Sequence, residues 1–240
     1  MYVPGYTYHI VQRGNNRAAC FYEEENYRVY IRYMCEVLPR YGNFLHAYCL
    51  MSNHVHLLIT PEFEDSISNF MKVVCSRYAQ YMNRKYARTG TLWEGRHKSS
   101  AIDSESYLLK CYRYIELNPV AAQIVDRPED YAWTSHHSNA WGEQDPLVSP
   151  HESYQALGRD LVLRCASYRH LFDEALSTED CCAIHGAAHS SLPLGSKKFV
   201  RDIERLSGRA LGYAHRGRPC AKLVKNKSLR PQLNASVPNK

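Results

Sequence analysis

The sequence has no pair of cysteines at the C-x-x-C spacing, no run of 18 consecutive apolar residues, and no basic segment followed by an apolar run near Met1. The first absence argues against the common zinc and thioredoxin-like motifs, the second against a membrane-spanning helix, and the third against a secretory signal. Several of the nine cysteines fall in apolar periodic stretches, where a reduced thiol packs as a small hydrophobic group. We therefore expect a reduced, cytoplasmic protein.

Phenylalanine is also scarce, with 6 residues against 19 tyrosines, and tyrosine offers both a polar tip and a ring on which a base can stack. The 240 residues, 45% of them hydrophobic and 22% charged, are enough for one good-sized core and an extension. This composition excludes a disulfide-stapled miniprotein, a collagen-like repeat and wholesale disorder.

Acidic residues are nearly absent from the C-terminal part of the chain. Residues 196–240 carry 12 Lys and Arg against Asp202 and Glu204, whereas the first 195 residues carry 18 basic and 22 acidic residues. A second basic region, residues 72–98, has Glu94 as its single acid. Both regions are expected to attract phosphate groups.

Hydrophobic periodicity predicts an α+β fold. Residues 6–12 and 98–102 read as strands, and two more β-rich runs, 44–50 and 54–60, are separated by three residues, as in a hairpin. Helical spacing covers 24–41 and 66–88, and Ser104 is a candidate N-cap for a helix toward Leu117. The order corresponds to a ferredoxin-like split βαββαβ antiparallel sheet with added helices and a basic C-terminal extension. One face of such a sheet packs against helices, which leaves the other for a ligand.

The composition divides the chain into four segments. Residues 1–125 hold the predicted sheet, and 126–150 form a proline-containing connector. Two or three helices are expected within 151–207, and 208–240 form a basic, flexible tail.

Two histidines on the strand 54–60 form the first candidate site. His54 and His56 are two residues apart, so both imidazoles project from one face of the strand. Two neutral ring nitrogens can hold one divalent cation. Taken alone, such a pair is more often a polar surface pair or a pair of hydrogen-bonded core groups.

The helix that ends near Pro119 carries the second candidate site. Tyr114 and Asn118 are four residues apart and share one helix face. The amide oxygen of Asn118 is a candidate third ligand, and the phenol of Tyr114 is placed to attack a phosphate held by the metal. The alternative is that the tyrosines pack on the sheet and Asn118 caps the helix. Tyr112 is the second choice as nucleophile, and Glu116, about 200 degrees round the helix from Tyr114, is expected to face solvent or form a salt bridge.

Three motifs together resemble one known family: residues 54–56 (HVH), 90–96 (GTLWEGR) and 114–119 (YIELNP). In this order and spacing they resemble the single-tyrosine HUH transposases and, more narrowly, the REP-associated tyrosine transposases of bacteria. The resemblance covers about residues 4 to 135. The insertion-sequence relatives carry Gln at the position of Asn118.

The resemblance implies a catalytic domain in residues 1–125 that binds Mg²⁺ or Mn²⁺ through His54, His56 and Asn118. It implies that Tyr114 attacks a phosphodiester of single-stranded DNA, forming a 5′-phosphotyrosine link and freeing a 3′-hydroxyl that later rejoins. The substrate would be hairpin-containing, REP-like repeats, which would make the protein nucleoid-associated. Some relatives are dimers, and the REP-associated branch is compatible with monomers, so either state remains open.

The two basic regions supply candidate DNA contacts. The assigned phosphate contacts are Arg77, Arg84, Lys85, Arg88, Arg96 and Lys98. Trp93 is assigned to base stacking, and Arg216 and Arg218, in an RGRP segment that resembles an AT-hook core, are assigned to a hairpin stem. For each basic residue the alternative is a solvated charged face.

Other interpretations remain open. A non-catalytic regulator that binds hairpin DNA or RNA would use the same scaffold without cleavage, and a replication-initiation or relaxase-type HUH nickase would cut without rejoining. His9 borders the site if its strand neighbours the hairpin; otherwise it is a packed strand histidine. The group Cys181, Cys182, His185 and His189 is either a zinc cluster or part of an ordinary helix.

Overall fold

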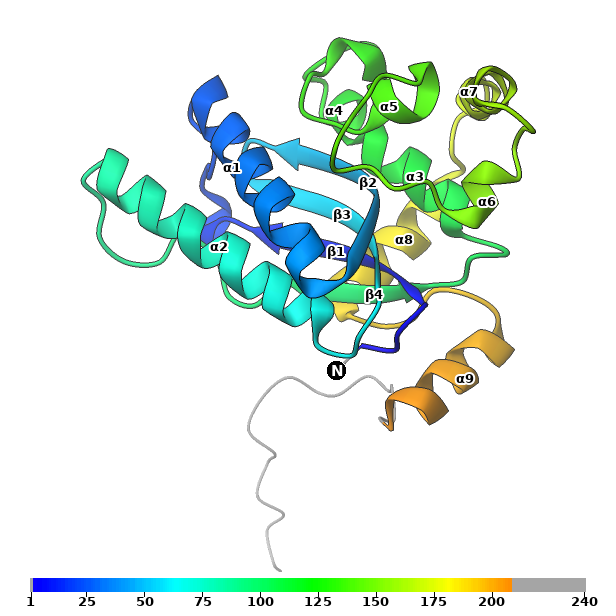
Figure 1. The fold of residues 1–240 in the computed structure, drawn as a ribbon, viewed down its shortest axis with the longest axis horizontal. Helices are drawn as coiled ribbons and strands as arrows, with labels where there is room; N and C mark the ends of the chain where they lie inside the picture. Colours follow the sequence, from blue (N-terminus) through cyan, green and yellow to red (C-terminus); the bar gives the residue numbers. More distant parts are fainter. Residues whose placement is uncertain (1, 209–240) are drawn as a thin grey trace, which may run out of the picture.

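The computed structural model describes residues 2–208, in which four antiparallel strands form one sheet (Figure 1). The strands are β1 (Thr7–Arg13), β2 (Asn43–Met51), β3 (His54–Pro61) and β4 (Lys98–Ile102), in the order β2-β3-β1-β4. This is the strand order of a ferredoxin-like split βαββαβ sheet, so the predicted fold class is confirmed. The bounds of β4 match the prediction, and each end of the other strands lies within one residue of it.

The central position of β1 determines which side chains share a face. β1 pairs with β3 so that Val11 lies opposite His56 and Arg13 opposite His54, and it pairs with β4 so that Val11 lies opposite Lys98. Opposite residues of antiparallel strands project to the same side. The alternate residues of β1 therefore face the same side as the histidine pair.

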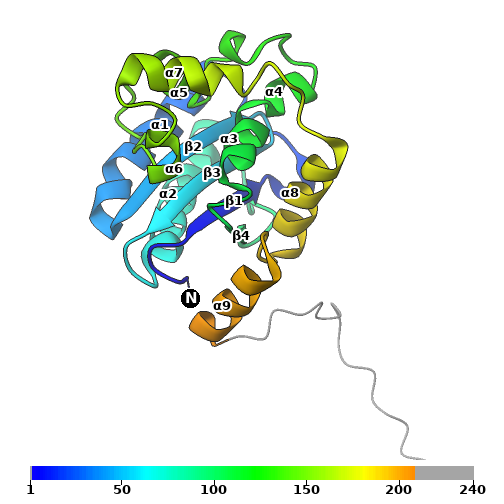
Figure 2. The same ribbon diagram turned by 90° about the vertical axis from the view of Figure 1, so that its right-hand side faces the viewer.

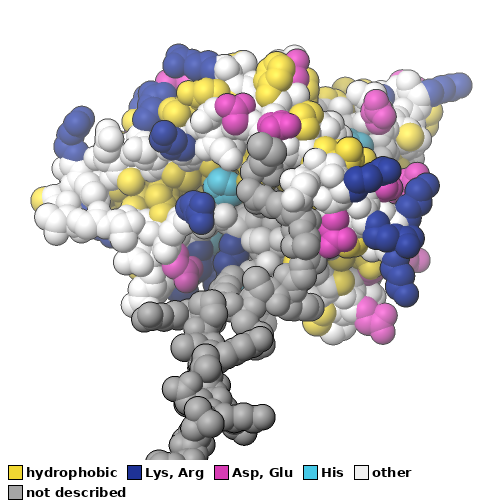
Figure 3. All heavy atoms as spheres, turned by 90° about the horizontal axis from the view of Figure 1, so that it is seen from below, with side chains coloured by type: hydrophobic (Ala, Val, Ile, Leu, Met, Phe, Trp, Pro, Cys, Tyr) yellow, Lys and Arg dark blue, Asp and Glu magenta, His cyan; other side chains and the backbone are white. Residues whose placement is uncertain are grey.

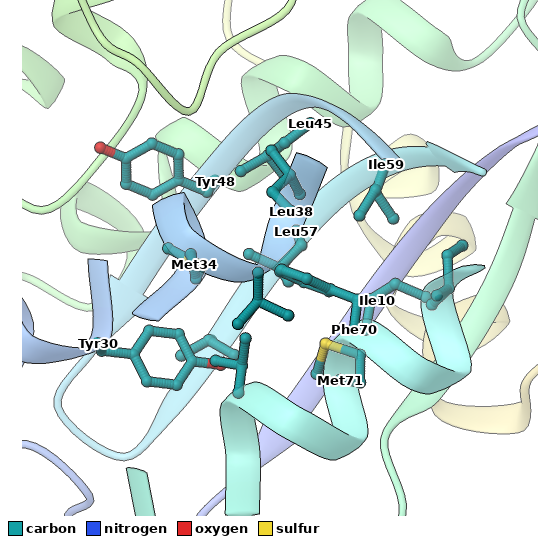
Figure 4. Packing of buried hydrophobic residues seen from close by; sticks show 14 of the residues in the cluster. Ile10, Tyr30, Met34, Leu38, Leu45, Tyr48, Leu57, Ile59, Phe70 and Met71 are labelled. Carbon is teal, nitrogen blue, oxygen red and sulfur yellow. The ribbon is translucent and has the colours of Figure 1, made fainter. Parts of the chain in front are cut away.

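Helices α1 (Glu24–Val37) and α2 (Ser66–Lys85) cover the other face of the sheet. A capping box between Glu23 and Asn26 starts α1 by pairing backbone N–H groups that the first helical turn leaves open. The core beneath combines apolar residues of β1 and β3, such as Ile10 and Leu57, with residues of both helices, such as Phe70 (Figure 4). This face is closed by apolar packing.

Helices α3 (Leu108–Glu116) and α8 (Thr178–Ser190) lie on the histidine face (Figure 2). Ala47 and Cys49 of β2 are fully buried there, and their small side chains let α3 approach the sheet closely. Tyr112 and Ile115 pack beneath α3 in this second core. The core stops short of the histidine pair, which lies beside the end of α3 that carries Tyr114.

The other elements surround the sheet. They are η1 (Asn15–Arg17), η2 (Leu38–Tyr41), α4 (Asn118–Ala121), η3 (Pro128–Asp130), α5 (His136–Trp141), α6 (Glu152–Gln155), α7 (Leu161–His170) and α9 (Lys197–Ser207). The segment predicted as a connector contains η3 and α5 and lies along β2, because Ser135 N donates to Tyr48 O and Leu50 N donates to Trp133 O. Among residues 2–208 no helix is long and apolar enough to span a membrane.

Two expectations about the helices need correction. Ser104 does not cap α3, which begins at Leu108; the carboxylate of Asp103 instead accepts from Glu105 N, and its carbonyl accepts from Tyr107 N, so residues 103–107 form a turn. The extension holds four helices, α6 to α9, rather than two or three. The segment predicted to be a flexible tail, residues 208–240, lies outside the described residues after Gly208.

Candidate active site

His54 and His56 project from the same side of β3, as the sequence predicts. Their ring centroids are 4.8 Å apart, with the ring planes at 79°. Burial, with a smaller contribution from Arg13, lowers the pKa of His54 to about 4, and burial lowers the pKa of His56 well below its usual value. Both imidazoles are therefore neutral near pH 7, which is the form that binds a metal.

His9 of β1 lies beside this pair. Its Nε2 is 2.8 Å from Nδ1 of His56, and their ring centroids are 5.1 Å apart. The side chain is fully buried, and burial, with the nearby His185 and His54, lowers its pKa to about 3. His9 is thus both a packed strand residue and a neighbour of the histidine pair, which unites the two interpretations of this residue.

The phenol of Tyr114 faces the histidines from α3. Its ring centroid is 6.0 Å from the centroids of both His9 and His56. Burial is the largest cause that raises the pKa of Tyr114 to about 12, while the charge of Arg13 lowers it. Tyr112, the alternative nucleophile, is fully buried and stacked on Tyr154, so it has no open path to a substrate. We call His9, His54, His56 and Tyr114 the histidine cluster.

Asn118 is the first residue of α4, directly after the break that follows α3. Its Nδ2 donates to the carbonyl oxygen of Tyr114 at 2.7 Å, which is the capping interaction that the sequence left as an alternative. This bond leaves Oδ1 as the amide atom able to bind a cation.

The donor set at the cluster fits a cation that also takes oxygen ligands. Within the described chain, no three His, Cys, Asp or Glu side chains are grouped so that they could hold a metal ion. His54 and His56 offer two nitrogens, and Asn118 Oδ1 and a substrate phosphate are the candidate oxygens. Carbonyl and phosphate oxygens are typical ligands of Mg²⁺ and Mn²⁺.

A cavity of about 260 Å³ opens beside Tyr114 and His56. Four cationic side chains line it, Arg13, Arg17, Arg96 and Lys98, against the single carboxylate of Glu94, so its charge is positive overall. Figure 3 shows a histidine side chain among lysine and arginine side chains on the underside of the molecule. Charge of this sign next to the phenol suits a phosphodiester.

Helix α8 supplies the far wall of this cavity. His185 and His189 line it, and Nδ1 of His185 lies 3.4 Å from the hydroxyl of Tyr114. The alternative zinc cluster of these histidines with Cys181 and Cys182 is not formed in the described structure, because no such group of ligands comes together. The two histidines are therefore part of the site rather than a separate metal centre.

Comparisons with known proteins agree with this arrangement. Residues 2–118 match the family model described as "Transposase IS200 like", and this stretch contains the histidine pair, Tyr114 and Asn118. The chain carries an IS200-like transposase domain. A solved structure described as "Structure of the REP associates tyrosine transposase bound to a REP hairpin" shares the fold, with a TM-score of 0.52 and 19% identity over 63% of this chain and 89% of that chain. No curated protein matches the chain.

Several basic residues of the transposase domain that were assigned to DNA bind other side chains of the domain. Arg77 pairs with Glu36 at 2.7 Å and lies over the ring of Tyr33, and Lys85 pairs with Glu23. Arg88 donates to the hydroxyl of Tyr22, whereas Arg84 is exposed. Arg77, Lys85 and Arg88 thereby connect α2 and the residues that follow it to α1 and the residues that precede α1. Of the assigned residues, Arg96 and Lys98 reach the cavity beside Tyr114.

Trp93 does not have the exposed ring that base stacking requires. It is 7% exposed, its indole N–H donates to the Cys75 carbonyl, and its ring packs against Tyr30 and Tyr78. The GTLWEGR segment thus closes the core of the transposase domain through Trp93. Arg216 and Arg218 lie outside the described residues.

Glu116 is buried rather than solvent-facing. Its Oε1 accepts hydrogen bonds from the Ser135 hydroxyl and the Asn139 amide, and its Oε2 accepts from His136 Nδ1 and the Tyr168 hydroxyl. All four distances are between 2.6 and 2.9 Å. We call these five residues the Glu116 cluster. It includes the hydrogen bond between Glu116 and His136 and connects the tyrosine helix to α5 and α7.

Sequence reasoning missed Arg13, Arg17 and His185 as lining residues. The position of Arg13 could have been predicted, because the alternation of side chains along β1 places it on the same face as His9. The position of His185 could not have been predicted, because α8 lies outside residues 2–118, which match the family model, and no local pattern indicates where α8 packs.

Proposed function

We propose that this protein is a metal-dependent single-strand DNA endonuclease and strand transferase of the REP-associated type, which acts on hairpin-containing repeats. The observation that carries the proposal is the position of Tyr114. Its phenol lies beside two neutral histidines and a cavity lined by four cations, within a transposase domain.

Tyr114 is the proposed nucleophile. Its Oη forms a bond to the phosphorus of a phosphodiester, and the bond from phosphorus to the 3′-oxygen breaks. The 5′-phosphate stays on Tyr114, and the 3′-oxygen takes up a proton and leaves as a hydroxyl. The phenol proton has an acceptor close by, Nδ1 of His185 at 3.4 Å. Attack by a 3′-hydroxyl on the phosphotyrosine reverses these steps and joins the strands.

Cations support this reaction at two points. Arg13 and Lys98 line the cavity beside Tyr114, where they would neutralise a bound phosphate. A Mg²⁺ or Mn²⁺ ion held by His54, His56 and Asn118 would polarise the phosphate and compensate for a phenol whose pKa is about 12.

The site is compatible with a monomer. The tyrosine and the histidines of one chain lie together, with ring centroids 6.0 Å apart, so a second copy is not needed to bring them into contact. This supports cleavage in cis.

Covalent capture tests the proposal. Labelled DNA hairpins with single-stranded flanks are incubated with the full chain and Mn²⁺ or Mg²⁺, and adducts are separated under denaturing conditions and identified by mass. We expect a DNA adduct on Tyr114 that is absent in Tyr114→Phe and in the presence of chelator. Tyr112→Phe is the matched control and should retain the adduct.

Two outcomes would overturn this function. An undiminished adduct in Tyr114→Phe would move the nucleophile elsewhere. Tight hairpin binding in chelator, without cleavage at either metal, would favour the non-catalytic regulator on the same scaffold.

A further inference from the structure

The amide of Asn53 fixes which nitrogen of His54 carries hydrogen. Asn53 Nδ2 donates to the carbonyl oxygen of Arg17 at 3.1 Å, which sets the orientation of the amide. Asn53 Oδ1 is 2.6 Å from Nδ1 of His54, and a carbonyl oxygen can only accept. Nδ1 of His54 is therefore the donor, and in the neutral ring Nε2 has the free lone pair.

A tight loop holds Asn53 in place. Gly14 N donates to the Asn53 carbonyl at 2.9 Å, so the loop after β1 is bound to the β2–β3 turn. A Cβ on Gly14 would lie 2.2 Å from the carbonyl oxygen of Ala18, so no larger residue fits there without rearrangement. The orientation of His54 is thus set by backbone contacts from a second segment.

His9 holds His56 in the corresponding way. Nδ1 of His56 faces Nε2 of His9 at 2.8 Å, and one of the two must donate. If His56 presents Nε2 to a cation, its hydrogen lies on Nδ1 and is donated to His9. The hydrogen of His9 then lies on its own Nδ1, an atom that is buried without a hydrogen-bond partner among the described residues.

An unpartnered nitrogen in a fully buried side chain lowers the stability of the fold. Stable folds therefore avoid such atoms unless the group is needed. A hydrophobic residue at position 9 would avoid that cost, and the flanking Tyr8 and Ile10 show that β1 otherwise packs well. The side chain of His9 thus has a use that packing does not explain: it accepts the Nδ1 hydrogen of His56.

We propose that Asn53 and His9 are positioning residues that accept the Nδ1 hydrogens of His54 and His56, so that both histidines present Nε2 to the same cation. This inference rests on the proposed metal-dependent function. Such second partners fix the tautomer and ring orientation of a ligating histidine, and their loss typically weakens metal binding about 10- to 100-fold.

Calorimetric titration of the full chain with Mn²⁺ alone tests the proposal without relying on activity. His9→Leu and Asn53→Ala each remove one acceptor, and we expect both to weaken Mn²⁺ binding about tenfold or more. His9→Gln and Asn53→Asp each keep an oxygen that can accept from Nδ1, and they should bind within a few-fold of the wild type.

Thr7→Val is the matched control. Thr7 lies on the same strand and face as His9, and its hydroxyl bonds to the hydroxyl of Thr60 at 2.8 Å, away from the histidine pair. The variant removes a partly buried hydrogen bond between two strands but leaves the histidine pair intact, so Mn²⁺ affinity should not change. A thermal unfolding midpoint for each variant identifies any loss that reflects unfolding.

The outcomes separate this inference from the proposed function. A folded His9→Leu that binds Mn²⁺ as tightly as the wild type, or a His9→Gln that binds as weakly as His9→Leu, overturns the inference alone. Absence of Mn²⁺ binding by the wild type overturns both.

Nitrogen NMR of the wild type provides the test if His9→Leu does not fold. With Mg²⁺ bound, hydrogen on Nδ1 of both histidines supports the inference, and hydrogen on Nε2 of His56 overturns it.

Discussion

Two clusters of buried polar side chains lie on the same side of the sheet, and they differ in how completely their hydrogen-bonding atoms are used. In the Glu116 cluster, each carboxylate oxygen accepts two hydrogen bonds from donors on other segments. In the histidine cluster, as far as the described residues show, His9 Nδ1 is buried without a partner, and the hydroxyl of Tyr114 forms only a long hydrogen bond of 3.4 Å to His185. The first arrangement is expected of a structural group and the second of a group that awaits a ligand.

The difference matters because each cluster includes a residue of the same helix, α3. Glu116 and Tyr114 are two residues apart on α3, with side chains on different sides. One side attaches α3 to α5 and α7, and the other presents the phenol to the cavity. A fixed helix beside an incompletely bonded site is what a reaction with defined geometry requires.

The largest effect on stability is expected from Glu116→Ala. It leaves four buried donors without their acceptor, which should lower the free energy of unfolding by about 3 to 5 kcal/mol. Urea unfolding followed by tryptophan fluorescence measures this loss. Glu116→Gln keeps one oxygen in place, so it should lose less, and a loss below about 1 kcal/mol in Glu116→Ala would remove the distinction between the clusters.

A smaller, pH-dependent effect is expected at His46, a buried histidine whose two nitrogens are both partnered. Nδ1 donates to Ser149 O at 2.7 Å, and Nε2 faces the hydroxyl of Thr60 at 2.8 Å. Burial lowers the pKa of His46 to about 4 in the folded state, against about 6.5 when unfolded. The unfolded chain therefore binds the proton first as pH falls, and stability declines between pH 6.5 and about 4.

The decline from His46 is at most about 1.4 kcal/mol per pH unit, or about 2 kcal/mol between pH 6.5 and 5. Urea unfolding of the wild type and of His46→Gln at both pH values isolates it from the other histidines. The variant should lose less stability on acidification. Equal losses would show that His46 does not contribute.

The sequence allowed the order of strands and helices along the chain and the shared face of His54 and His56 to be predicted, because apolar periodicity indicates each element and alternate residues of a strand share a face. It also placed Glu116 on a different side of the helix from Tyr114. It could not show that α5 and α7 lie on that side, so the burial of Glu116 was missed.

The other features that the sequence did not reveal also depend on segments that are distant in the chain. Trp93 lies in the irregular segment between α2 and β4, whose local sequence is compatible with exposure, but its burial depends on Tyr30 of α1 and Tyr78 of α2. The contact between His9 and His56 depends on β1 pairing with β3, and the position of His185 depends on α8 crossing the sheet. Packing between distant segments decides each of these, and local periodicity carries no information about it.

The smallest effect is expected when the histidine cluster itself is made apolar. In the double variant His9→Leu/His56→Leu, both partners of the 2.8 Å hydrogen bond are removed together, and so is the unpartnered nitrogen. Replacing both members of a buried pair with apolar groups of similar shape is nearly neutral or stabilising, so the free energy of unfolding should change by less than about 1.5 kcal/mol. Urea unfolding beside Glu116→Ala gives the direct contrast. A loss as large as that of Glu116→Ala would mean that these histidines stabilise the sheet. A stable variant that does not bind Mn²⁺ would instead mean that the two histidines serve metal binding and do not contribute to the stability of the fold.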